Sequence, residues 1–181
     1  MKRDNKGFTL VELVVVIAML SIFLGIFVTN IGQITGYNAK ECYKKITSAI
    51  TAEKINTLGK AKKTGERYLQ IYRDTATDRI YVQTVTNANT TGVTPTVIDK
   101  TKLTKRSGVK VGYETSDGNT VNDVVSGSEL NICFNRATGA MVNLDAGNTP
   151  STLKYIYITA GSYRYTIELE PRTGKIISAQ R

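Results

Sequence analysis

The sequence predicts an α+β protein in which a long N-terminal helix packs on an antiparallel β-sheet head domain. An uncharged apolar run from Leu13 to Val28 leads directly into a segment with apolar residues at three- and four-residue spacing, which is typical of one continuous helix. Beyond residue 66, short runs of alternating apolar and polar residues are separated by Gly, Asp and Asn, which is typical of antiparallel strands. A chain of 181 residues has room for one domain and one appended segment.

Composition and charge limit the classes of function. The chain has 24 Lys and Arg against 15 Asp and Glu, and the formal charge of +9 favours anionic partners. It has no His, so the commonest general base and metal ligand is missing. The sequence also contains no Gly-rich phosphate loop, and its carboxylates are scattered singly. We therefore expect no enzyme, no cofactor and no metal site.

The N-terminus combines positive charge with an apolar run. Lys2, Arg3 and Lys6 precede the run, which favours a cytoplasmic N-terminus. A helix from Phe8 to Val28 would be about 30 Å long, which matches a bilayer core. A secretory signal peptide is the alternative interpretation. Because the apolar run is long for a signal peptide and no clear small-residue cleavage site follows it, we expect a membrane-spanning helix.

Glu12 places a carboxylate inside this apolar run. A charge at the centre of a membrane helix costs about 2.5 to 3.5 kcal/mol on insertion scales, so the residue needs a partner or a function. A cut between Gly7 and Phe8 would create an α-ammonium group on Phe8, one helical turn before Glu12. We expect the carboxylate and the amine to bond within one chain or to fix the register between neighbouring chains.

Residues 6–12 read Lys-Gly-Phe-Thr-Leu-Val-Glu. Together with the apolar helix that follows, they resemble the prepilin motif of type IV pilins and type II secretion pseudopilins. The resemblance implies cleavage after Gly7 by a prepilin peptidase, N-methylation of Phe8, and a role for Glu12 in recruiting and registering the incoming subunit. It implies as partners other pilin or pseudopilin subunits, the inner-membrane assembly platform, and membrane lipid before assembly. The protein would be a single-pass membrane protein that later joins an extracytoplasmic, cell-surface filament.

The chain is expected to have four parts. Residues 1–7 form a cleaved leader, residues 8–30 the transmembrane and filament-core helix, residues 31–65 the amphipathic half of the same helix, and residues 66–181 the β-rich globular head. Gly59 and Gly65 indicate where the helix ends. The apolar stripe expected to face the head consists of Ile31, Ile34, Cys42, Ile46, Ala49, Ile50 and Leu58.

Several strands are predicted in the head. They cover residues 68–73, 79–85, 109–113, 130–135, 140–142, 155–159, 163–170 and 175–177. In the run 163–170, Tyr163, Tyr165, Ile167 and Leu169 alternate with polar residues, which predicts a half-buried strand. The order of a long helix, antiparallel strands and a final hairpin is similar to that of minor pilins and pseudopilins of the H type, including the FimT-like proteins.

A pilin-like subunit that binds DNA during uptake is the alternative to a purely structural subunit. The leader carries three cations and one carboxylate, so its removal lowers the net charge only from +9 to +7. The candidate phosphate contacts are Lys60, Lys62, Lys63, Arg67, Lys102, Lys105, Arg106, Arg172, Lys175 and Arg181. Clusters of Lys and Arg are common on solvated surfaces without a nucleic-acid role, so DNA is not the expected partner.

The two cysteines, Cys42 and Cys133, lie far apart in the sequence. An exported protein could join them in a disulfide. Unpaired cysteines also commonly pack as small apolar residues in a core. The sequence leaves both interpretations open.

Overall fold

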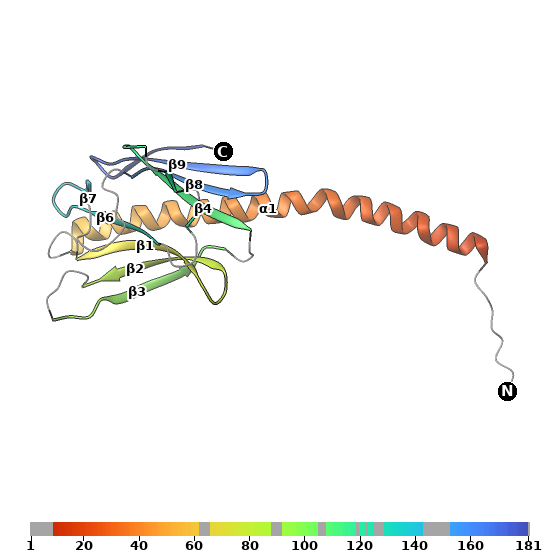
Figure 1. Cartoon of the computed structure of the whole chain (residues 1–181), viewed down its shortest axis with the longest axis horizontal. Coiled ribbons are helices and arrows are strands. Elements are labelled where there is room, and N and C mark those ends of the chain that lie inside the picture. The colour runs from red at the N-terminus through yellow and green to blue at the C-terminus, as the bar shows by residue number, and fades with distance from the viewer. Residues whose placement is uncertain are drawn as a thin grey trace, which may run out of the picture.

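The computed structural model confirms the predicted α+β class (Figure 1). It describes residues 9–61, 66–87, 92–104, 108–118, 120–121, 123–124, 129–142 and 153–180, with the backbone alone at 27–34, 121 and 178–180. Within these residues the chain forms one helix, α1 (Leu10–Lys60), and two five-stranded antiparallel sheets. The C-terminal half of α1 lies against both sheets, and its N-terminal half extends away from the head (Figure 1).

Helix α1 begins with a capping box. The Thr9 hydroxyl accepts a hydrogen bond from the Glu12 backbone amide, and the Glu12 carboxylate accepts one from the Thr9 amide. The helix has 51 residues, which corresponds to about 75 Å. It ends at Lys60, between the two glycines that predict its end, and Ala61 follows in an extended conformation.

The ten strands divide evenly between the two sheets. The first sheet has the order β3-β2-β1-β6-β7, formed by β1 (Arg67–Asp74), β2 (Arg79–Thr86), β3 (Thr96–Lys102), β6 (Glu129–Phe134) and β7 (Met141–Val142). The second has the order β10-β9-β8-β4-β5, formed by β4 (Val109–Thr115), β5 (Thr120–Val121), β8 (Leu153–Ala160), β9 (Tyr163–Glu170) and β10 (Lys175–Gln180). All paired strands are antiparallel. The sequence does not predict this division into two sheets.

Each predicted strand has a counterpart in the structure, and β9 has the predicted bounds. Tyr165, Ile167 and Leu169 are buried on one face of β9, as the alternation predicts. Strand β3 is not predicted by the sequence. It pairs with β2 at the edge of the first sheet, and five of its seven residues are exposed, so its polar composition lacks the signal of a buried face.

The face of α1 that packs on the head differs in part from the predicted stripe. Cys42, Ile46 and Ile50 are buried as predicted. Leu58 is 43% exposed, which corrects its predicted burial, and Glu53 and Thr57 are buried in its place. The buried positions keep helical spacing, so the face of α1 that packs on the head continues past Ile50 through Glu53 and Thr57. The Glu53 carboxylate bonds to Arg67 and Thr84 in the head.

Among the α1 residues whose side chains the structure describes, contacts with the head begin at Thr35 and Gly36. The turn between β8 and β9 lies against the helix there, and a Cβ atom added to Gly36 would lie 2.9 Å from Cζ of the Tyr163 ring. Gly161 in the same turn approaches the side chain of Thr35. A residue larger than glycine at position 36 would therefore push the hairpin away from the helix.

Two turns interlock at the other end of the head. Gly174, between β9 and β10, has φ +59, and an added Cβ atom would lie 2.3 Å from the Gly139 carbonyl oxygen and 2.8 Å from the Phe134 ring. The Met141 amide donates to the Pro171 carbonyl at 2.8 Å. These contacts join the β6–β7 turn of the first sheet to the β9–β10 turn of the second.

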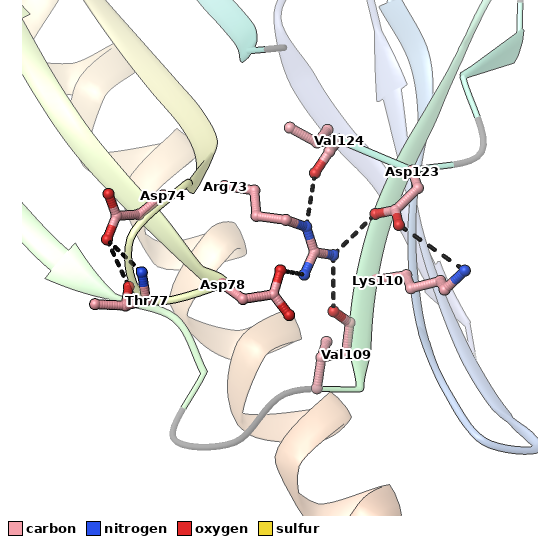
Figure 2. A network of polar contacts seen from close by, with 8 residues as sticks. All are labelled: Arg73, Asp74, Thr77, Asp78, Val109, Lys110, Asp123 and Val124. Atoms are coloured by element: carbon pink, nitrogen blue, oxygen red, sulfur yellow. Dashed lines mark hydrogen bonds and ion pairs between the residues drawn. The ribbon is translucent and has the colours of Figure 1, made fainter. Parts of the chain in front are cut away.

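Arg73 connects the two sheets (Figure 2). It lies near the end of β1, and β1 ends on the side of the head nearest to the apolar half of α1 (Figure 1). It extends from the end of β1 and donates to the carbonyl oxygens of Val109 at 3.3 Å and Val124 at 3.2 Å. Its guanidinium also pairs with Asp78 at 3.3 Å and Asp123 at 3.1 Å. Because the Arg73 side chain is 10% exposed, these bonds satisfy a nearly buried charge.

Cys42 and Cys133 are two buried thiols in the structure. Cys42 belongs to the core between α1 and the sheets, and so do Ile132 and Phe134, the neighbours of Cys133. Since successive strand residues face opposite sides of a sheet, Cys133 lies on the face away from Cys42. Burial raises the pKa of the Cys42 thiol to about 12, which makes it a poor nucleophile at neutral pH.

Candidate processing and assembly site

The N-terminal half of α1 presents an apolar surface on all sides. Its large apolar side chains from Leu10 to Ile26 are between 46% and 78% exposed. Contiguous exposed apolar surface of this extent marks a site of protein or membrane contact. Among the residues whose side chains the structure describes, no helix combines the length and the apolarity required to cross a membrane.

Glu12 lies at the start of this surface, in the first turn of α1. Its carboxylate accepts hydrogen bonds from the Thr9 amide and the Thr9 hydroxyl, both at 2.9 Å. The helix N-terminus also favours a negative charge, because the first backbone amides point toward it. The carboxylate is therefore held at the N-terminal end of the helix. Gly7 and Phe8, the predicted processing residues, lie outside the described residues.

Comparison with known protein families identifies this N-terminus. Residues 2–28 match the family described as the prokaryotic N-terminal methylation motif. The chain carries a prepilin-type N-terminus. This motif is typical of type IV pilins and pseudopilins, so the predicted resemblance is confirmed at this level. The search of curated proteins and the search of solved structures each give no match for this chain.

The prepilin-type motif indicates the general class of subunit to which the protein is similar. It indicates a pilin-like or pseudopilin-like subunit that a prepilin peptidase processes and that assembles with other pilin subunits. It also implies a protein that is first anchored in a membrane and later exposed on a surface filament. Proteins with this motif are structural rather than enzymatic. The match covers the leader, Glu12 and the apolar part of α1, and it does not reach the head.

The basic residues proposed as DNA contacts are only partly described. Lys62, Lys63, Lys105, Arg106 and Arg181 lie outside the described residues. The other five do not form a single patch. Lys102 ends β3, near the apolar half of α1, whereas Arg172 and Lys175 belong to the β9–β10 turn and the start of β10 at the opposite end (Figure 1). Lys60 and Arg67 line a groove of about 630 Å³ between α1 and the first sheet.

The structure assigns Arg67 a structural role that the sequence does not show. Its guanidinium pairs with the Glu53 carboxylate through two bonds, of 3.1 and 3.2 Å. The Glu53 side chain is 1% exposed and also accepts hydrogen bonds from the hydroxyls of Thr84 at 3.1 Å and Thr57 at 3.3 Å. This buried pair attaches the end of α1 to β1 and β2. A phosphate contact by Arg67 would leave the buried Glu53 carboxylate without its cationic partner, so Arg67 is not available for DNA.

Proposed function

We propose that this chain is a minor pilin or pseudopilin, a structural subunit of a type IV pilus-like filament. It is cut between Gly7 and Phe8, methylated on the new Phe8 amine, and assembled through the N-terminal half of α1. The observation that carries this proposal is the exposed apolar half of α1, which begins at the capped Glu12 inside the prepilin-type motif. Such an apolar surface has to be covered by membrane lipid or by other protein chains.

Before assembly, the apolar half of α1 would be inserted in the cell membrane with the leader in the cytoplasm. The described apolar side chains run from Leu10 to Ile26, and the sequence stays uncharged to Val28. After assembly, the same surface would be covered by the helices of neighbouring subunits. The inner-membrane assembly platform is the expected partner for the transfer between these two environments.

In the proposed organisation, four successive segments of the chain have different roles. Residues 1–7 would be the leader, 8–30 the membrane and filament-core segment, 31–65 the helix that carries the head, and 66–181 the head. The described side chains up to Ile26 are exposed and Gly36 is buried against the head, which supports a change of environment between these positions. The exposed surfaces of the head would then decide which partners the filament meets.

The head supports a minor subunit of the H type rather than a DNA-binding subunit. The resemblance to the H type rests on the order of a long helix, antiparallel strands and a final hairpin. That final hairpin packs on the β6–β7 turn, because Gly174 lies against Gly139 and Phe134. A DNA-binding function is not the one we propose, since the described basic residues are spread over both ends of the head and Arg67 is committed to Glu53.

Processing can be tested directly on the full chain. We expect co-expression with a prepilin peptidase to give a mature protein that starts at Phe8, with or without one added methyl group, as measured by intact mass spectrometry. Gly7→Leu should remain uncut because the peptidase must accommodate the residue before the bond. Gly25→Leu is the matched control and should be cut normally, since Gly25 has open space around it. A start beyond Val28 would instead identify a secreted protein.

Assembly should depend on Glu12. In Glu12→Ala, the ammonium group of Phe8 loses its partner, and an unpaired buried charge costs several kcal/mol. Because every 1.4 kcal/mol is a factor of about ten, we expect filament yield to fall by more than about tenfold, as measured by shearing and quantitative immunoblotting. Cleavage should proceed as in the parent chain. Glu41→Gln, which removes a carboxylate further along the same helix, is the control and should assemble. An equal loss of filament in both variants would contradict a specific role for Glu12.

A further inference from the structure

We propose that the end of the head nearest to the apolar half of α1 is a basic rim that rests on anionic phospholipid headgroups before the subunit joins a filament. This inference rests on the proposed function, because it requires the apolar half of α1 to be inserted in a bilayer. It adds a second contact with the membrane, one made by the folded head rather than by the helix.

The distance along α1 brings this end of the head close to the headgroups. The uncharged run ends at Val28, and the head contacts the helix at Thr35 and Gly36. Because α1 is continuous over this interval, Thr35 lies about 10 Å beyond Val28 at about 1.5 Å per residue. This is about one Debye length at 0.1 M salt. Charges at this end of the head therefore lie within electrostatic range of the lipid phosphates.

Five elements have a cation at or near this end of the head, where β2, β4 and β9 begin and β3 ends beside α1 (Figure 1). The register of the second sheet places Thr159 between Lys110 of β4 and Arg164 of β9. In the first sheet, Arg79 begins β2 and Lys102 ends β3, and the Leu103 amide next to Lys102 donates to the Ile80 carbonyl next to Arg79. We define the basic rim as Lys40, Arg79, Lys102, Lys110 and Arg164.

The arginine network of Figure 2 pairs two carboxylates at this end of the head with a cation. Asp78 and Asp123 both lie at the same end of the head, and both pair with the guanidinium of Arg73. Arg73 itself is nearly buried, so its charge is used inside the protein. Lys110 completes the network, because its ammonium group lies 3.9 Å from the Asp123 carboxylate. Arg73 and Lys110 together balance two carboxylates that would otherwise repel anionic lipid.

The other carboxylates at this end also have partners within the protein. Glu41 pairs with Lys45 at 3.0 Å, one turn along α1. Asp74 accepts hydrogen bonds from the hydroxyl and the amide of Thr77, which hold the pKa of its carboxyl below the usual value. Glu129 of β6, which is paired with Tyr72, accepts a hydrogen bond from the Gln70 side-chain amide at 2.6 Å. Counting the rim together with Lys45 and Arg73, seven cations face five carboxylates at this end. The surplus of positive charge fits a layer of phosphodiesters and places it where a bilayer would be.

The rim can be located with single tryptophan reporters, because the chain contains no Trp. Ser162→Trp reports from the exposed β8–β9 turn beside the rim, and Thr173→Trp from the exposed turn at the opposite end. Each full-length, processed chain would be reconstituted into vesicles that contain a nitroxide-headgroup lipid, with either phosphatidylglycerol or phosphatidylcholine as the bulk lipid. Quenching of Trp fluorescence then measures how close each turn lies to the headgroups.

We expect stronger quenching of the Ser162→Trp reporter in phosphatidylglycerol than in phosphatidylcholine. The excess should be lost in about 1 M NaCl, where the Debye length is about 3 Å. It should also be lost in Lys110→Gln with Arg164→Gln and retained in the matched pair Arg172→Gln with Lys175→Gln. The Thr173→Trp reporter should be equally weakly quenched in both lipids.

Quenching at Ser162→Trp that is equal in both lipids and insensitive to salt would overturn the proposal, since the helix alone would then set the position of the head. Vesicle flotation separates this result from failure of the proposed function. A chain that floats with the vesicles but shows no lipid dependence lacks the rim contact, whereas a chain that does not float is not inserted through α1.

Discussion

The Gly174→Ala variant is expected to lose most of the stability of the head. Its Cβ atom would lie 2.3 Å from the Gly139 carbonyl oxygen, a backbone atom that cannot rotate away, and 2.8 Å from the Phe134 ring. The residue also has φ +59, where a non-glycine residue is strained by about 1 to 2 kcal/mol. Forcing extra volume into a packed site adds about 1 to 3 kcal/mol. The sum is a large fraction of the roughly 5 to 15 kcal/mol that stabilises a typical domain.

Thermal unfolding of the detergent-solubilised chain, followed by circular dichroism, measures this loss. A cost of about 3 kcal/mol corresponds to a fall in Tm of about 6 to 12 °C for a protein of this size. Gly118→Ala is the matched control, because Gly118 also has positive φ but has no atom within 4 Å of the added Cβ. Equal shifts in the two variants would show that backbone strain alone, and not the contact between the two turns, sets the cost.

The second large effect is expected at the buried pair of Glu53 and Arg67. The Arg67→Met variant leaves the Glu53 carboxylate almost fully buried with hydroxyl partners alone. Removing one partner of a buried ion pair costs about 3 to 5 kcal/mol, because a charge is left without compensation in a poorly solvated site. We expect a correspondingly lower free energy of unfolding in urea, with the end of α1 detached from β1 and β2.

A second substitution separates lost charge pairing from lost packing. Glu53→Leu combined with Arg67→Met removes both charges, and buried ion pairs replaced by apolar residues often cost nothing. The double variant should therefore regain most of the stability that the single variant loses. Lys60→Met changes an exposed cation in the same groove and should have little effect. If the double variant is as unstable as Arg67→Met, packing of the Arg67 side chain, and not its charge, stabilises this site.

The features that the sequence predicts well are encoded by neighbouring residues. Strand β9 is predicted by strict alternation over eight residues. The face of α1 that packs on the head is predicted at Cys42, Ile46 and Ile50 by their helical spacing. Each pattern extends over a few turns of helix or one strand, so the residues in a short window are sufficient to predict the element.

The features that the sequence misses depend on contacts between distant segments. Glu53 replaces Leu58 on the buried face because Arg67 and Thr84, from two strands, supply the partners for its carboxylate. Strand β3 has no strong pattern of its own and is stabilised as an edge by pairing with β2. Polarity alone places Glu53 in solvent, and only its partners reverse that assignment.

The sequence by itself determined the N-terminal motif, the continuous helix, the positive charge and most of the strands. The motif is a run of consecutive residues, and regular backbone structure follows from local periodicity, so neither requires a fold to be known. Only the tertiary structure decided how the head divides into two sheets, and which charged side chains are buried in it or exposed on its surface. Arg73 meets Asp123 across 50 positions, and Gly174 meets Gly139 across two hairpins. Such pairs are set by chain topology and by the burial of a shared core, which leave no mark in the spacing of neighbouring residues.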